Sequence, residues 1–90
     1  MIQAVEVTTE ATLLVSTNIR RRLLLIANNS DTVTMYVKLD SSTTELTAAN
    51  GYPIKPNGQL SLSCDPNDWR GPVYGITAAN TVDARITEIE

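Results

Sequence analysis

Histidine and phenylalanine are absent from this chain of 90 residues, and cysteine and tryptophan occur once each. Without histidine, the Ser-His and Cys-His pairs that activate a nucleophile cannot form. The single cysteine, Cys64, cannot close an intramolecular disulfide, and one thiol without histidine is a poor set of metal ligands. Acidic side chains such as Asp31 and Asp83 are expected in turns or at solvent-facing strand positions. We therefore predict no enzyme activity and no catalytic, metal or cofactor site.

A basic excess is also missing, because ten acidic residues stand against seven basic ones, for a net charge of −3. Binding to nucleic acid and to anionic membranes relies on positive charge, so we expect neither partner. No apolar run approaches the length that spans a bilayer, and the first six residues lack the basic start and apolar stretch of a signal peptide. We expect a protein that is made in the cytoplasm and stays soluble until it assembles with something.

A chain of this length fits one compact domain with a limited core. Because a disulfide and a metal are disfavoured, oligomerisation or docking onto a larger body is the favoured source of extra stability, and a well-packed monomer is the alternative. We predict a single β domain over residues 1–90, in which residues 1–19 form N-terminal strands or an arm and residues 20–90 form the core sandwich.

Period-two alternation of apolar and polar residues is the strongest pattern that is present. It is clearest in residues 32–39, and it recurs in residues 60–64, 74–78 and 82–87. Residues 2–8 and 13–16 are rich in Val, Leu and Thr, which favour strands. Residues typical of turns separate these runs at Asn28–Asp31, Asn50-Gly51, Pro56–Gly58 and Asp65–Asp68.

These patterns predict an all-β protein: a small antiparallel β-sandwich, jelly-roll or immunoglobulin-like, of about seven to eight short strands, with a small barrel as the alternative. Residues 41–50 fit a strand, a wide loop or a single helical turn. A strand over residues 20–27 contains four consecutive apolar residues, Leu23–Ile26, so both of its faces are expected to be buried. The N-terminal segment or a neighbouring subunit would then cover the face that points away from the core.

Arg20–Arg22 is the one basic cluster in the sequence. In a strand its members point to alternating faces, so the cluster is not a single patch of three charges. We interpret it as solubilising charge that discourages pairing at a sheet edge. A salt bridge to an acidic partner surface is the alternative interpretation.

Two other segments have a simple structural interpretation. The run Asp65–Asp68 does not fit a calcium loop, because the sixth and twelfth positions counted from its first aspartate are Arg70 and Ile76 instead of glycine and glutamate. We interpret it as a turn. Cys64 follows an alternating apolar run, so we predict a small core residue instead of a reactive thiol.

Aromatic residues are scarce enough to be weighed one by one. Exposed Trp, Tyr and Arg side chains dominate the energetics of protein interfaces. The candidate protein-interface residues are Tyr36, Tyr52, Trp69, Arg70 and Tyr74. A coplanar pair of these rings would instead suit a sugar-stacking platform, and Trp69 alone would equally suit a lid that closes one end of the core.

Five segments follow one another in a distinctive order: Arg21–Asn28, Val33–Val37, Asn50–Ile54, Pro56–Gly58 and Asp68–Ile76. This order resembles small virion proteins of tailed bacteriophages. In that family, segments of the forms RxxLxIxN, NGxxLxPG and WxGxVYxI recur in compact β domains, and the resemblance covers residues 20–90. Here a plain Pro-Gly is replaced by Pro56-Asn57-Gly58.

The resemblance implies a structural virion protein that decorates or cements the bacteriophage head. Its expected partner is the major capsid protein or another virion protein, and its expected state is a homo-oligomer, with a trimer favoured. Its expected location is the virion. Two alternatives from other classes stay open: a carbohydrate-binding module, and a tail or head–tail adaptor.

Overall fold

The protein folds into eight strands, described by a computed structural model for residues 1–39, 46–47, 50–63 and 69–90, with no helix among these residues. The prediction of a small all-β sandwich of seven to eight strands is confirmed. The strands are β1 (Ile2–Val7), β2 (Thr12–Val15), β3 (Leu23–Asn28), β4 (Met35–Leu39), β5 (Tyr52–Ile54), β6 (Gln59–Ser63), β7 (Val73–Thr77) and β8 (Val82–Ile89).

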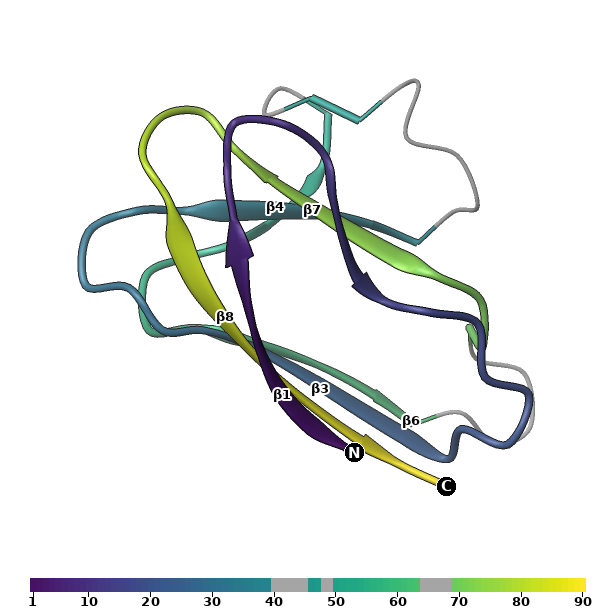
Figure 1. Cartoon of the computed structure of the whole chain (residues 1–90). Helices are drawn as coiled ribbons and strands as arrows, with labels where there is room; N and C mark the ends of the chain where they lie inside the picture. Colours follow the sequence, from purple (N-terminus) through teal and green to yellow (C-terminus); the bar gives the residue numbers. More distant parts are fainter. Residues whose placement is uncertain (40–45, 48–49, 64–68) are drawn as a thin grey trace.

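The strands form two antiparallel sheets of four, in the orders β1-β8-β3-β6 and β2-β7-β4-β5 (Figure 1). Consecutive strands lie in different sheets at every connection except the one between β4 and β5. Eight strands in this order give a jelly roll, so the immunoglobulin-like alternative is wrong for this chain. Residues 1–19 supply an edge strand to each sheet, and the two chain ends lie side by side because β1 pairs with β8.

The hydrophobic core fills the space between the sheets. Burial of one such aliphatic side chain contributes roughly 1.5–3 kcal/mol, so the inner faces dominate the stability of the domain. A bulge in β2 turns the consecutive residues Leu14 and Val15 toward this space. The core cluster is Val7, Leu14, Val15, Leu24, Ile26, Met35, Val37, Ile54, Val73, Val82, Ala84 and Ile86.

The turn predicted at Asn28–Asp31 is confirmed after β3, with one correction. Asn28 belongs to β3 and is buried, although its sequence context predicted a turn. Its Nδ2 donates to the carbonyl oxygens of Val33 and Ile54, both at 2.8 Å, and its Oδ1 accepts from the amide of Ser30 at 3.1 Å. One amide therefore joins β3, the turn and β5.

Strand β5 was not predicted, because Pro53 interrupts a run of only three residues. Proline is tolerated there because β5 is an edge strand, whose outer amides need no partner. Gly51 precedes it at a close approach, since a Cβ at this position would lie 2.7 Å from Tyr36 Cβ. The predictions for Cys64, for Asp65–Asp68 and for most of residues 41–50 lie outside the described residues.

Candidate functional site

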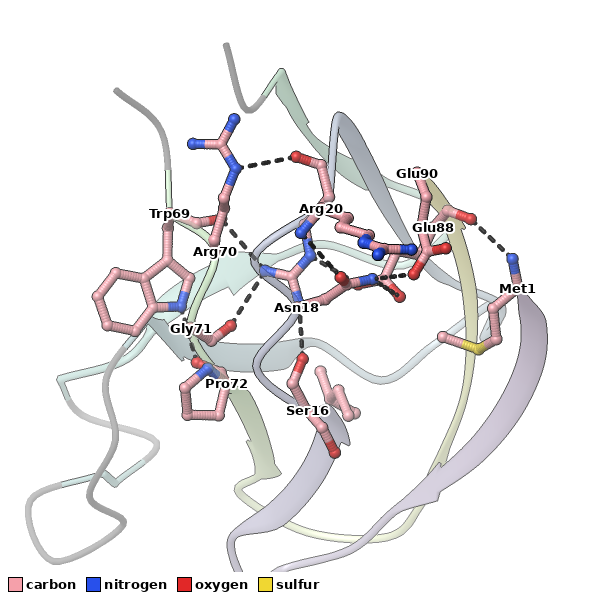
Figure 2. Close-up of polar contacts among 12 residues, drawn as sticks. Met1, Ser16, Asn18, Arg20, Trp69, Arg70, Gly71, Pro72, Glu88 and Glu90 are labelled. Atoms are coloured by element: carbon pink, nitrogen blue, oxygen red, sulfur yellow. Dashed lines mark hydrogen bonds and ion pairs between the residues drawn. The ribbon is translucent and has the colours of Figure 1, made fainter. Parts of the chain in front are cut away.

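A buried ion pair between Arg21 and Glu88 lies at one end of the sandwich, where several chain segments meet. Arg21 Nε donates to Glu88 Oε2 at 2.7 Å, and both side chains are buried. The remaining guanidinium nitrogens donate to three backbone carbonyl oxygens: Nη2 to Ser16 at 2.8 Å, and Nη1 to Trp69 at 3.1 Å and Gly71 at 3.0 Å (Figure 2). Arg21 therefore connects β8 with the segments that follow β2 and precede β7.

The sequence interpretation of Arg20–Arg22 as solubilising charge is wrong for Arg21. Strand β3 begins only at Leu23, so the three arginines do not alternate across a sheet. Arg20 and Arg22 are exposed, while the backbone turns Arg21 inward through a bond from its amide to the Asn18 carbonyl at 3.1 Å. The signal for this burial, Glu88, lies 67 residues away in the sequence.

A hollow of about 410 Å³ opens beside this ion pair, and Asn18 and Glu90 are among its lining residues. Asn18 Nδ2 donates to Glu88 Oε1 at 3.1 Å and to Glu90 Oε1 at 2.8 Å, so the polar groups here already bind one another. Within the described ranges no buried side-chain nitrogen or oxygen lacks a hydrogen-bond partner, and no cluster of acidic or thiol side chains is arranged for a metal ion. The geometry is that of a structural clamp.

Trp69 and Arg70 lie at this same end, in the segment before β7. The Trp69 indole donates from Nε1 to the Pro72 carbonyl at 2.8 Å, and its ring packs against the core (Figure 2). A Cβ on Gly71 would lie 2.7 Å from Trp69 Cε2, so glycine is needed beneath the ring. Arg70 is half-buried and donates from Nε to the Arg21 carbonyl at 3.1 Å. This geometry matches the lid described for Trp69.

Tyr36 and Tyr74 lie together elsewhere, on the outer face of the β2-β7-β4-β5 sheet. The register pairs Tyr74 with Leu13 and with Lys38, and Tyr36 with Ile76 and Pro53, which places these residues in two rows that point away from the core. Both tyrosines are half-buried, and Ile76 is buried although its row points outward. We call this surface the tyrosine face: Leu13, Tyr36, Lys38, Pro53, Tyr74 and Ile76.

Tyr52 does not belong to the tyrosine face. It pairs with Val37, which points into the core, and it is exposed at the edge of its sheet. The five candidate interface residues are therefore divided among three places: the end of the sandwich, the tyrosine face and one sheet edge.

The outer face of the other sheet carries an apolar surface that contains none of the five candidate interface residues. Its signal was the run Leu23–Ile26, of which Leu23 and Leu25 point outward and are half-buried. The N-terminal strand does not cover them, as one alternative expected, because β1 lies in the same sheet. We call this surface the aliphatic face: Ile2, Leu23, Leu25 and Ile89.

A second ion pair lies on the same outer side of the β1-β8-β3-β6 sheet. Arg85 Nη2 and Asp83 Oδ2 are 2.7 Å apart, and Asn29 Nδ2 donates to the same oxygen at 3.3 Å. The hydrogen bond from Arg85, followed by that from Asn29, lowers the pKa of the Asp83 carboxyl from its usual value. Both members are well exposed, so this pair is screened by solvent.

No protein-family model, curated protein or solved structure matches this chain. Among the described residues no helix is long and apolar enough to cross a membrane.

Proposed function

We propose that this protein is a non-catalytic structural component of a virus particle, a head-decoration or cement protein of the tailed-bacteriophage type that binds the capsid exterior. The observation that carries the proposal is the tyrosine face, which presents two half-buried aromatic rings, the exposed Leu13 side chain and one lysine on a regular sheet. Tyrosine supplies large contact area with little loss of side-chain entropy, as protein-binding surfaces require.

The rest of the molecule is consistent with a rigid binding domain. The Arg21 and Glu88 side chains form a clamp within the fold, and Trp69 closes the end of the core. Jelly rolls occur in capsid proteins and in lectins, so the fold alone does not select between them. Sugar binding would require an exposed, coplanar pair among Trp69, Tyr52 and Tyr74. The Trp69 ring packs against the core, and Tyr52 and Tyr74 lie on opposite sides of their sheet.

Virion composition tests the proposal directly. Particles of the bacteriophage whose genome encodes this chain are separated into heads and tails, and each fraction is measured by quantitative mass spectrometry. We expect the chain in the head fraction, in a fixed ratio to the major capsid protein. Its presence only in tails or connectors would favour the adaptor alternative, and its absence from both fractions would overturn the proposal.

A second measurement addresses the surface. Co-sedimentation with heads that lack the protein is compared for the wild type, for Tyr74→Ala and for Thr81→Ala, which alters an exposed residue between β7 and β8 that belongs to neither outer face. We expect Tyr74→Ala to weaken binding about tenfold or more, as at an interface hot spot. Thr81→Ala should bind as the wild type does. Equal binding by all three proteins would remove the tyrosine face from the capsid contact.

A further inference from the structure

The aliphatic face is an apolar surface that no described segment covers. Ile2 is 83% exposed and Ile89 is 43% exposed, while Leu23 and Leu25 are half-buried in the middle of the sheet. The register places Ile2 and Leu25 on either side of Thr87, and Ile89 directly beside Leu23, so the four side chains share two adjacent rows. We propose that this face is an interface with a second copy of the same chain.

The charges on this side of the sheet favour a copy of the chain over a charged partner. Along the strands of the sheet, the ionised side chains in outward rows are Glu6, Asp83 and Arg85. Asp83 and Arg85 neutralise each other at 2.7 Å. The surface therefore offers little charge for an oppositely charged partner to recognise. Glu6 is the remaining charge, and it lies near the opposite end of β1 from Ile2, so two copies that meet at the aliphatic face do not bury it. Interfaces between identical subunits are the more apolar class.

The dimensions of the molecule are also sufficient. Its smallest extent is 16 Å, which fits two sheets packed face to face, and its two broad sides measure 35 by 26 Å. A standard interface takes roughly 800 Å² from each partner, which a side of this size can supply. A small domain with a limited core also gains stability when a partner covers such a face.

Sedimentation velocity and light scattering on the full chain test this interface, over a concentration range of about 1–100 µM. Ile2→Asp and Leu25→Asp place a charge on the aliphatic face, and Leu13→Asp places the same charge on the tyrosine face as a matched control. We expect the wild type and Leu13→Asp to show two or three copies. Each aliphatic-face variant should raise the dissociation constant at least tenfold.

Ile2→Asp keeps the test valid if Leu25→Asp unfolds, because Ile2 is far more exposed and lies at the start of an edge strand. A monomeric wild type at every concentration overturns the proposal. So does an oligomer that Ile2→Asp leaves intact, or one that Leu13→Asp dissociates. This inference goes beyond the proposed function and is independent of it, since the mass measurement contains no capsid and virion composition does not report self-association.

Discussion

Strand β8 carries two ion pairs that have the same contact distance and opposite surroundings. Arg21 Nε and Glu88 Oε2 lie 2.7 Å apart with side chains that are 0% and 7% exposed. Arg85 Nη2 and Asp83 Oδ2 also lie 2.7 Å apart, but their side chains are 58% and 43% exposed. The contact distance therefore does not show which pair matters more for stability. The two pairs differ in the free-energy cost of removing one partner, and that cost depends on how far water reaches the charge that is left.

The two pairs also differ in what they connect. Asp83 and Arg85 are two residues apart on one face of one strand, so their contact does not connect separate segments of the chain. Arg21 and Glu88 are 67 residues apart, and the same guanidinium donates to carbonyl oxygens before β3 and before β7. Loss of the buried pair should therefore affect the whole domain, whereas loss of the exposed pair should have a local effect.

The largest expected effect comes from Arg21→Ala. This change leaves the Glu88 carboxylate buried without its cation and removes the donor from three carbonyl groups. We expect a loss of about 3–5 kcal/mol in the free energy of unfolding, as for other buried pairs that lose one partner. Urea denaturation followed by circular dichroism measures it. Arg20→Ala is the matched control, since its exposed side chain should contribute less than about 0.5 kcal/mol.

The double variant Arg21→Met with Glu88→Leu makes this comparison more specific. If burial of an uncompensated charge is the cause, removal of both charges should restore much of the stability that Arg21→Ala loses. A double variant as unstable as the sum of the single ones would contradict this explanation. The destabilisation by Arg21→Ala would then come from the lost hydrogen bonds to the three carbonyl groups.

Trp69→Ala should have the next largest effect. The ring is partly buried against the core, and its removal leaves a void beside Gly71. We expect a loss of about 2 kcal/mol in the free energy of unfolding, below the range for a fully buried tryptophan. Tyr52→Ala is the control, because that ring is exposed at a sheet edge and should change stability little. Equal stability of both variants would show that Trp69 is not a lid.

These contrasts show what the sequence could and could not predict. Alternation in β4 and β8 is a local pattern, and it predicted which residues face the core. The run Leu23–Ile26 likewise predicted an apolar outer surface. Burial of Arg21 could not be predicted, because it depends on a register that brings Glu88 to it from the far end of the chain. A charged residue is ordinarily exposed unless such a partner exists.

The tyrosine face was predictable only in part for the same reason. Residue type identified Tyr36 and Tyr74, but only the pairing of β4 with β7 places them on one surface and separates them from Tyr52 and Trp69. Pairing between strands distant in sequence is set by the whole core, and a local pattern does not contain it.

The smallest expected effect, Asp83→Asn, tests the other half of the comparison. Arg85 and Asn29 lower the pKa of Asp83 in the folded protein, so the ionised carboxylate adds stability above the unfolded pKa, and this contribution is lost as pH falls through the folded pKa. We expect Asp83→Asn to lower the melting temperature slightly at pH 7. The difference from wild type should begin to shrink only as pH falls below about 4, the unfolded pKa, and should vanish below the lower folded pKa. High salt at pH 7 should shrink the difference too, because the pair is exposed. A difference that persists in acid and in salt would mean that the carboxylate acts through packing or through its bond from Asn29, and the contrast between the two ion pairs of β8 would then rest on the buried pair alone.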